Sequence, residues 1–265
     1  MSKRKIAEHS SAKCIAHYPS LTHKKIIITG GASGIGASLV EYFLAQHCHV
    51  AFLDIDETAA NQLQDQLCNP ETLKFFACDV SDFNAFQKTM QRAIEYLEGI
   101  NVLINNAGSD ARHSSLKVTE AQWEKIINVN LRAQFIAAQA VIPWMKKNTG
   151  SSIINMSSNC FLLNSNFEYP VYATAKSAIV GLTRTLASEF GKDNIRVNAI
   201  LPGWVMTERQ IKAYLTREAE IELLKRQVLK QKIYPSDISR VALFLASEES
   251  RMITQQCILV DAGRI

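Results

Sequence analysis

The feature that most constrains this chain is a regular alternation between short apolar runs and longer amphipathic segments. The apolar runs have the length of single β-strands, and the segments between them have the length of helices. Continuous apolar runs are typical of parallel strands covered on both faces, and parallel neighbours need a crossover connection, usually a helix. The alternation therefore predicts an α/β protein with three layers, in which a doubly wound, seven-stranded parallel sheet carries helices on both faces. The expected strands are residues 25–29, 49–53, 72–77, 102–105, 152–156, 195–200 and 256–260.

The domain organisation follows from where this alternation begins and where it is interrupted. It starts at Lys24, and no Pro-, Gly- or Ser-rich linker and no internal repeat divides the sequence after that point. We therefore expect one domain over residues 24–265, preceded by an N-terminal extension over residues 1–23. Residues 207–232 form a long, charged stretch after the sixth expected strand. Because ligands of doubly wound folds bind outside the carboxyl ends of the strands, we expect this insertion to be a substrate lid.

Composition and charge exclude several kinds of function. The net charge is only +4, and part of it lies in the terminal run Lys3-Arg4-Lys5, so we expect no nucleic-acid partner. No apolar stretch approaches the roughly 20 residues of a membrane helix, and the first residues lack the apolar centre of a secretory signal. The six cysteines are scattered, without a Cys-x-x-Cys pair or a zinc-like Cys/His spacing. We therefore expect a cytoplasmic protein that binds a small-molecule substrate and has neither a metal site nor a membrane partner.

A glycine-rich turn stands between the first expected strand and the first expected helix. Residues 29–36 read TGGASGIG, in which three glycines have the spacing G-x-x-x-G-x-G. Glycines at these positions allow a tight turn and a close approach of the backbone to a pyrophosphate, which the amides at the start of the helix then bind. The motif and its position predict a Rossmann-type dinucleotide site. The expected cofactor residues of this turn are Gly30, Ser33, Gly34, Ile35 and Gly36.

The end of the second expected strand indicates which dinucleotide is bound. Asp54 stands there, 18 residues after Gly36. A carboxylate at this place hydrogen-bonds the hydroxyls of the adenosine ribose and repels a 2′-phosphate. An NADP site is expected to carry a basic side chain nearby, whereas Ser33 and Ile55 occupy the two obvious positions. The expected cofactor is therefore NAD, and its further contacts after the third and fourth strands are Asp79, Val80, Asn106, Ala107 and Gly108.

Several motifs stand in one order along the chain: the glycine turn, Asn-Asn-Ala-Gly at 105–108, Asn130, Ser158, Tyr-Ala-Thr-Ala-Lys at 172–176 and Pro202-Gly203. Together they resemble the short-chain dehydrogenase/reductase family over residues 24–263. The resemblance implies a Rossmann-like fold, a nicotinamide cofactor, hydride transfer and a homotetramer. The catalytic residues that it implies are Asn130, Ser158, Tyr172 and Lys176.

The spacing of Tyr172 and Lys176 has a chemical meaning of its own. Residues four apart on a helix share one face. A phenol with a pKa of about 10 is a poor base at neutral pH, but a close ammonium group and the positive nicotinamide ring favour the phenolate. Tyr172 would then take the proton of a substrate hydroxyl while hydride leaves the same carbon for the cofactor. We expect Ser158 to hold the substrate oxygen, Lys176 to bind the nicotinamide ribose as well, and Asn130 to position a water.

Two serines compete for the catalytic position. Ser158 precedes Tyr172 by fourteen residues, one more than is usual in the family, and Ser157 by fifteen. A one-residue insertion between Asn164 and Tyr169 would account for the longer gap, so we favour Ser158. Tyr169 is not the expected base, because no lysine follows it at four residues.

The segment after the sixth strand completes the expected site. By the family resemblance it contacts the carboxamide of the nicotinamide, through Gly203, Val205 and Thr207. Trp204 either faces the substrate or packs in the core, since both places are ordinary for tryptophan. The expected substrate residues are Ser158, Cys160, Tyr172, Trp204 and Gln210.

Three stretches resemble the sugar 1-dehydrogenase branch of the family. They are residues 110–113, residues 202–210, and residues 243–247 taken with 260–263. The resemblance implies hydride transfer from the anomeric carbon of a cyclic aldose to NAD, which gives a lactone. Ser109, Ala111 and Phe161-Leu162 depart from that branch and remove polar partners that a sugar would use. Two alternatives remain: a 3-oxoacyl-carrier-protein reductase or another alcohol dehydrogenase of the same family, and a non-catalytic NAD-binding regulator.

Overall fold

The computed structural model describes residues 16–163 and 168–265, and a parallel sheet lies at its centre. The strand order is β3-β2-β1-β4-β5-β6-β7, and every pair of neighbours is parallel. The chain reverses its direction of winding between the first and fourth strands, which is the mark of a doubly wound fold. The predicted fold class is therefore confirmed. The strands are β1 (Lys25–Thr29), β2 (His49–Asp54), β3 (Leu73–Ala77), β4 (Val102–Asn105), β5 (Ser151–Met156), β6 (Ile195–Pro202) and β7 (Cys257–Val260).

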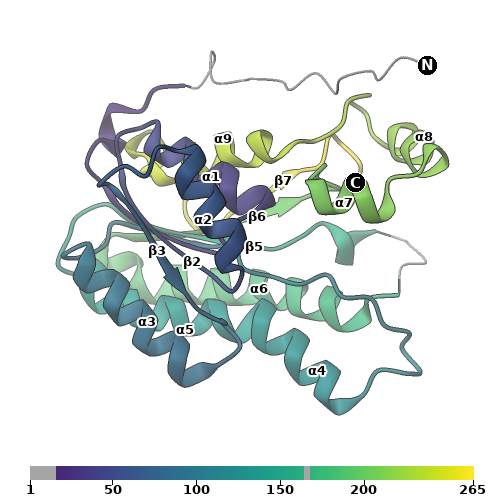
Figure 1. Cartoon of the computed structure of the whole chain (residues 1–265), viewed down its shortest axis with the longest axis horizontal. Coiled ribbons are helices and arrows are strands. Elements are labelled where there is room, and N and C mark those ends of the chain that lie inside the picture. Colours follow the sequence, from purple (N-terminus) through teal and green to yellow (C-terminus); the bar gives the residue numbers. More distant parts are fainter. Residues whose placement is uncertain (1–15, 164–167) are drawn as a thin grey trace.

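Helices cover both faces of the sheet (Figure 1). They are α1 (Gly34–Leu44), α2 (Glu57–Gln66), α3 (Phe83–Tyr96), α4 (Glu120–Ile127), α5 (Ala133–Met145), α6 (Pro170–Phe190), α7 (Glu208–Tyr214), α8 (Arg217–Arg226) and α9 (Pro235–Ala246). Shorter turns of helix are Pro19–Leu21, Cys160–Leu162, Gly191–Asp193 and Glu248–Ser250, all 3₁₀, and the π-helical Asn128–Arg132. α1, α2 and α9 lie on one face, and α3, α5 and α6 lie on the other with α4 beside α6. Within the described ranges, no helix has the length and apolar character that a bilayer crossing requires.

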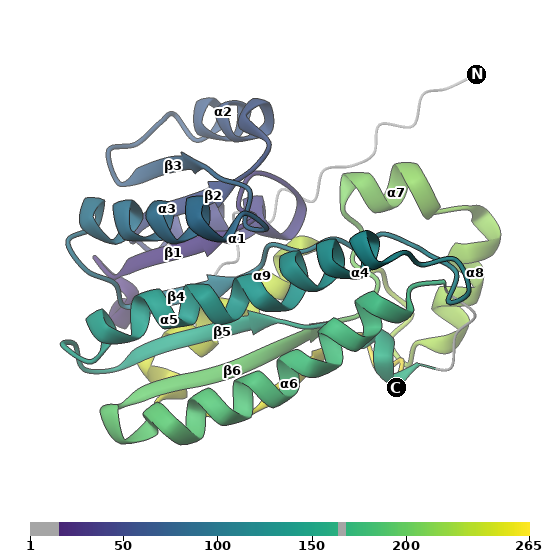
Figure 2. The same cartoon turned by 90° about the horizontal axis from the view of Figure 1, so that it is seen from below.

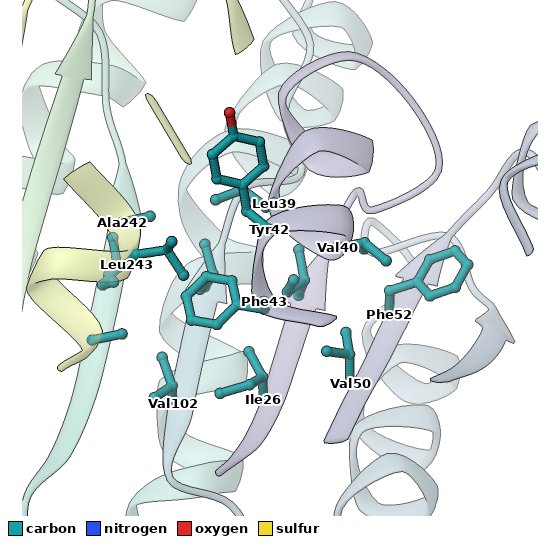
Figure 3. Packing of buried hydrophobic residues seen from close by; sticks show 14 of the residues in the cluster. Ile26, Leu39, Val40, Tyr42, Phe43, Val50, Phe52, Val102, Ala242 and Leu243 are labelled. Atoms are coloured by element: carbon teal, nitrogen blue, oxygen red, sulfur yellow. The ribbon is translucent and has the colours of Figure 1, made fainter. Parts of the chain in front are cut away.

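The apolar runs fill two cores, one on each face of the sheet. Successive residues of a strand point to opposite faces, so Ile26 and Ile28 of β1 enter one core and Ile27 enters the other. In the first core, Phe43 of α1 and Leu243 of α9 pack over the strands (Figure 3). Burial on both faces explains why the strands read as continuous apolar runs rather than as alternating ones.

The domain begins earlier than the sequence analysis predicted. Residues 1–15 of the expected extension lie outside the described residues, but Leu21 is fully buried in the core beneath α1. Its carbonyl accepts a hydrogen bond from Cys48 Sγ at 3.2 Å, and the backbone N–H of Tyr18 donates to Gln46 Oε1 at 2.8 Å. The expectation of an extension up to residue 23 is therefore wrong for this last part. One buried leucine in a short turn leaves no periodic signal in the sequence.

The carboxyl ends of the strands all lie at one edge, where α7 and α8 are also found (Figure 2). Thr29, Asn105 and Asn155 are partners in register across three neighbouring strands, so the loops that follow them are brought side by side. The residues predicted to form the site follow these strand ends. α7 and α8 belong to the segment 207–232, whose role as a lid stays a prediction.

Candidate functional site

A cavity of about 1100 Å³ runs along this carboxyl edge. Its wall begins at the glycine turn, passes the ends of the central strands and reaches α7 and α8. All the residues expected to contact cofactor or substrate line it, and of the expected catalytic residues only Asn130 does not. Positions more than 170 residues apart in the chain, such as Gly30 and Gln210, are thus gathered around one space.

The glycine turn has the geometry of a cradle. Gly30 and Gly34 have φ angles of +66° and +55°, a region that side-chain-bearing residues rarely adopt. A Cβ atom on Gly36 would lie 1.8 Å from the carbonyl oxygen of Gly30. Asn106 Nδ2 donates a hydrogen bond to that same oxygen at 2.8 Å, so this side chain fixes the turn, and its contact with the cofactor stays a prediction. Ser33 is the N-cap residue of α1 and is exposed. Its hydroxyl accepts no hydrogen bond from the first turn of α1, all of which the structure describes.

Asp54 is held at the side of this turn by the backbone. Its Oδ2 accepts a hydrogen bond from the N–H of Ala32 at 2.8 Å, and its Oδ1 accepts one from Asp56 at 3.0 Å. The neighbouring Ile55 is 68% exposed. A carboxylate fixed at the end of β2 and flanked by an exposed apolar residue fits the hydroxyls of a ribose better than a phosphate.

The loop after β3 adds Asp79 and Val80 to the wall. Asp79 Oδ1 accepts hydrogen bonds from the backbone N–H and the hydroxyl of Ser81, at 2.8 Å and 2.7 Å. Val80 is buried, and Asp79 is exposed at the rim. These two residues therefore close the cavity on the β3 side.

The segment after β6 forms the wall opposite the glycine turn. A Cβ on Gly34 would lie 3.1 Å from Thr207 Cγ2, so the two walls nearly meet there. Thr207 Oγ1 caps α7 by accepting a hydrogen bond from the N–H of Gln210 at 3.3 Å. Gly203 donates its N–H to the carbonyl of Val260, and Val205 is buried.

Tyr172 and Lys176 lie on one face of α6, as their spacing predicts. Pro170 occupies the first turn of this helix, where its missing N–H costs nothing. Lys176 Nζ lies 5.5 Å from the centre of the Tyr172 ring and donates to the carbonyl of Met156 at 2.9 Å. Lys176 is 3% exposed, whereas Tyr172 is partly exposed to the cavity.

Asn130 approaches this pair from the π-helical segment between α4 and α5. Its Nδ2 donates to the carbonyls of Ser109 and Ile126, and its Oδ1 accepts from the N–H of Ser109 at 3.1 Å. A Cβ on Gly108 would lie 2.9 Å from Asn130 Oδ1 and 3.3 Å from Lys176 Nζ. A side chain at position 108 would crowd both the Asn130 amide and the Lys176 ammonium group. π-Helical turns often mark functional sites.

The structure separates the two candidate serines. Ser157 is buried, and its Oγ donates to the carbonyl of Lys176 at 2.6 Å, which ties β5 to α6. Ser158 is hydrogen-bonded to the hydroxyl of Tyr172, and its Oγ accepts from the N–H of Cys160 at 3.2 Å. Ser158 therefore lies beside the phenol and Ser157 does not. The insertion expected between Asn164 and Tyr169 falls mainly on residues 164–167, outside the described residues.

The electrostatics of the pair differ from the expectation. Burial raises the pKa of Tyr172 above its usual value, and the nearby Cys160 and Asp110 add to the rise, while the hydrogen bond from Ser158 opposes it. Burial also lowers the pKa of Lys176 to about 8. The expected lowering of the Tyr172 pKa is therefore absent from the protein alone, because desolvation disfavours the charged form of both groups.

The far end of the cavity carries a polar network. Trp204 Nε1 donates to Gln210 Oε1 at 2.9 Å, and Gln210 Nε2 donates to Asp110 Oδ2 at 2.8 Å. Arg209 Nη1 lies 2.6 Å from Asp110 Oδ1. Cys160 is buried in the wall close by. Trp204 thus lines the cavity with its indole N–H engaged, and the network can offer donors and acceptors to a polar ligand.

Comparison with known proteins identifies the family. A family model described as "Enoyl-(Acyl carrier protein) reductase" matches residues 30–264, which is most of the chain. This chain belongs to the short-chain dehydrogenase/reductase family. It is therefore an oxidoreductase, as the order of its motifs predicts.

Individual relatives of this short-chain dehydrogenase/reductase cover almost its whole length. It is 41% identical to a "Probable galactose dehydrogenase" of Rhizobium meliloti over 250 residues, 94% of this chain and 97% of the relative. It is also 41% identical to a "D-xylose 1-dehydrogenase" of Caulobacter vibrioides over 249 residues, 94% of this chain and 98% of the relative. A crystal structure of a "putative short-chain alcohol dehydrogenase" from Sinorhizobium meliloti matches with a TM-score of 0.86 at 30% identity, covering 93% of this chain and 98% of that one.

Sequence reasoning missed two residues of this short-chain dehydrogenase/reductase site, Asp110 and Arg209. Asp110 comes two residues after Asn-Asn-Ala-Gly, and Arg209 directly precedes Gln210. Because both residues are charged and stand next to predicted cavity residues, they could have been named as candidate site residues. Their contact with each other could not have been predicted, since they lie 99 residues apart in the chain. Across residues 16–163 and 168–265, no three His, Cys, Asp or Glu side chains gather where a metal ion could be held.

Proposed function

We propose that this oxidoreductase oxidises an aldose at C1 to its lactone and passes the hydride to NAD. Relatives named as a galactose dehydrogenase and a D-xylose 1-dehydrogenase share 41% of their residues with it over nearly the whole chain. The observation that carries the proposal is the place of Ser158, Tyr172 and Lys176 in one cavity with the glycine turn. The polar network at the far end of that cavity supports a substrate with several hydroxyl groups.

In the proposed reaction, each catalytic side chain has one task. Tyr172 takes the proton of the C1 hydroxyl, and Ser158 holds that oxygen as it becomes a carbonyl. NAD, when bound, supplies the acceptor for the hydride that leaves C1. Lys176 stabilises the phenolate and binds the nicotinamide ribose, and its charge acts strongly because its side chain is almost fully buried. Asn130, which meets Lys176 across Gly108, positions a water.

The cofactor-binding residues that we propose fit a dinucleotide. The glycine turn leaves no room for a Cβ atom at Gly36, so the backbone there can approach a ligand closely. The backbone amides at the start of α1 can then bind a pyrophosphate. Asp54 supports NAD over NADP, since it would repel a 2′-phosphate. We expect the wild type to prefer NAD in kcat/KM by at least about tenfold, and the double variant Asp54→Ser/Ile55→Arg to narrow or reverse that preference. A wild-type preference for NADP would refute the NAD proposal.

The test of the proposed activity is an oxidation assay on a panel of aldoses and simple alcohols, with NAD and NADP in parallel. We expect NADH production with at least one aldose and recovery of the corresponding lactone. Tyr172→Phe and Ser158→Ala should each lower kcat by at least about 100-fold. Ser157→Ala is the matched control, because the Ser157 hydroxyl bonds to the backbone away from the phenol. Equal turnover by Tyr172→Phe and wild type would refute the catalytic assignment.

The same panel, extended by reduction of an acetoacetyl thioester with NADPH, separates the two alternatives. A 3-oxoacyl-carrier-protein reductase would reduce an acetoacetyl thioester with NADPH and leave aldoses untouched, but Asp54 argues against that cofactor. A non-catalytic regulator would bind NAD and turn over nothing, although it has no use for a phenol paired with an ammonium group. Lactone formation that depends on Tyr172 would refute both.

We also propose the remaining expectations as parts of this function. Residues 207–232 act as a substrate lid within one domain, and the chain forms a homotetramer, as the family resemblance implies. The cysteines of the described residues are free, which supports a reduced, cytoplasmic setting. Sizing chromatography that returns the mass of a 29.6 kDa monomer would refute the tetramer.

A further inference from the structure

Helix α5 packs an apolar face against the sheet, and one polar side chain interrupts that face. Gln134 is 2% exposed, and the other residues that the helix buries are alanine, isoleucine, valine and methionine. An amide taken out of water costs free energy unless hydrogen bonds in the protein replace those it made with water. A residue that breaks the pattern of a core face in this way is a candidate for a specific role.

The side chain of Gln134 reaches the last residue of β5, directly before the two serines of the site. Its Nε2 donates a hydrogen bond to the carbonyl oxygen of Met156 at 3.1 Å. Lys176 Nζ donates to the same oxygen at 2.9 Å. A carbonyl oxygen has two lone pairs and can accept both bonds. Side chains from α5 and α6, which lie on the same face of the sheet (Figure 1), therefore meet on one backbone oxygen.

Gln134 is itself held by the sheet. Its backbone carbonyl accepts a hydrogen bond from Asn105 Nδ2 at 3.3 Å, and the same nitrogen donates to Asn155 Oδ1 at 2.9 Å. Asn105 and Asn155 are buried partners in register on β4 and β5. The main chain of Gln134 is thus bonded to β4 and its side chain to β5. A residue fixed at both places can hold the Met156 oxygen in one direction.

The direction of that oxygen affects where the Lys176 ammonium group lies. The ammonium has three N–H donors, and the bond to Met156 engages one of them. Its Nζ lies 5.5 Å from the centre of the Tyr172 ring, and a Cβ on Gly108 would lie 3.3 Å from it. The bond to Met156 therefore keeps the ammonium close to the part of the cavity that Tyr172 and Gly108 line.

The two donors also share the capacity of the Met156 oxygen to accept hydrogen bonds. A bond from an ammonium group is stronger than one from an amide, and burial strengthens it further. If the amide of Gln134 were removed, the oxygen could turn fully toward Lys176 and hold it more strongly. Because Gln134 is neutral, it acts on Lys176 through this oxygen and not through a charge.

We propose that Gln134 is a positioning residue for the reaction: by holding the Met156 oxygen from the side of α5, it limits the hold of that oxygen on Lys176 and keeps the ammonium directed at Tyr172. Gln134 is not among the described residues that line the cavity, so it acts through Met156 and Lys176 rather than on a ligand. The inference rests on the proposed roles of Tyr172 and Lys176. It gives a function to a polar side chain that the packing of α5 does not require.

The pH profile of kcat/KM for oxidation tests this inference in Gln134→Met, which keeps the length of the side chain and removes its donor. The Met156 oxygen then draws the ammonium away from the phenol, so the acid limb should move to higher pH by about half a pH unit. Below the limb, the rate should fall by about threefold. The Kd for NADH should rise by about 2- to 5-fold, because Lys176 is also the proposed ligand of the nicotinamide ribose.

The variant isolates position from charge. The titratable groups that face Lys176 are Tyr172 on its own helix, Cys160 after β5 and Asp110 after β4. Gln134→Met leaves all of them in place and changes no charge. Gln134→Asn keeps the amide but is one methylene shorter, so its amide no longer reaches Met156, and the limb should move in the same direction.

The matched control is Ser152→Ala. Ser152 is fully buried near the start of β5, and its Oγ donates to the carbonyl of Leu245 at 2.9 Å. Its loss also removes a buried bond from a side chain to a backbone carbonyl on this strand, but at the end away from the cavity. This variant should be less stable in urea unfolding, with the wild-type limb and the wild-type Kd for NADH.

A fall in kcat/KM by the same factor at every pH, without a shift of the limb, would overturn the inference in favour of a merely structural contact. A shift of the limb to lower pH, or an equal shift in Ser152→Ala, would overturn it too. Turnover that survives Tyr172→Phe refutes the proposed function and this inference together. A dead Tyr172→Phe with an unmoved limb in Gln134→Met refutes the inference alone. If Gln134→Met does not fold, Gln134→Asn decides the question by itself.

Discussion

Replacing Gly36 with alanine tests whether the glycine turn is a cradle for the cofactor. The added Cβ would lie 1.8 Å from the carbonyl oxygen of Gly30, and Cβ atoms essentially never approach another heavy atom within 3.0 Å. The turn and the helix start must therefore separate by more than 1 Å. The oxygen of Gly30 is held by Asn106 Nδ2 at 2.8 Å, and a Cβ on Gly36 would also come within 2.9 Å of that nitrogen. The start of α1 is the part that has to move.

The expected cost follows from this displacement. Hydrogen bonds to a charged group contribute about 1.5–3 kcal/mol each, and they weaken steeply when the donor is displaced by an ångström. Loss of one such bond and weakening of a second gives about 3 kcal/mol, which is roughly a 100-fold rise in the Kd for NADH. Overpacking of the turn should also lower the free energy of unfolding by about 1–3 kcal/mol.

The assay is a fluorescence titration with NADH, combined with urea unfolding of each variant. Gly181→Ala is the matched control, because Gly181 lies within α6 and its added Cβ would meet no described atom within 4 Å. That control should bind NADH as the wild type does and be more stable by about 0.5–1 kcal/mol, since glycine is unfavourable inside a helix. A folded Gly36→Ala protein with the wild-type Kd would refute the reasoning.

Three further predictions concern stability and pH. Leu21→Ala should lower the free energy of unfolding by about 2–5 kcal/mol, because it leaves a cavity in the core. The control Leu116→Ala, at a side chain that is 96% exposed, should change that free energy by less than about 0.5 kcal/mol. Equal effects of the two variants in urea unfolding would show that residues 16–23 are not part of the core. The pKa of Lys176 is lowered to about 8 in the folded state, whereas in the unfolded state it is about 10.5. Between pH 8 and pH 10.5 the unfolded state therefore binds more protons than the folded state, so the free energy of unfolding should rise with pH. Relative to Lys176→Met, the wild type should gain about 2 kcal/mol between pH 8 and pH 10, and parallel curves would contradict this. Because the Tyr172–Lys176 pair can lose its first proton at the Lys176 pKa of about 8, the acid limb of kcat/KM for oxidation, which reports the free enzyme, should lie near pH 8, and a limb above pH 10 would contradict this.

The parts of this protein that depend on local pattern were readable from the sequence. The strands were predicted because burial on both faces leaves continuous apolar runs, and their ends were correct to within two residues. The glycine turn was predicted because its backbone needs positive φ angles and a close approach that only glycine allows. Tyr172 and Lys176 were paired because a spacing of four residues places them on one helix face whatever the rest of the chain does.

The parts that depend on contacts between distant segments were not readable. The Asp110–Arg209 pair joins the loop after β4 to helix α7, and the distance between them is set by the whole sheet, so neither residue carries a local sign of the contact. The π-helical turn that presents Asn130 depends on how α4 and α5 pack, and helical periodicity does not reveal it. The direction of the Tyr172 pKa also escaped prediction, because a sequence gives the nearby charges but not the burial that outweighs them.

The pKa of Tyr172 and the pKa of Lys176 shift in opposite directions, but both shifts have the same main cause, which is burial. Burial penalises each group for being charged alone, which raises the pKa of the phenol and lowers that of the amine to about 8. A pair that carries phenolate and ammonium together has no net charge, and the attraction between its members is strong where the groups are buried. When the pair loses its first proton, the neutral product therefore includes the phenolate–ammonium form that the proposed proton abstraction requires. The burial that makes Tyr172 a weak acid by itself thus makes its proposed role dependent on Lys176, which its four-residue spacing places on the same face of α6.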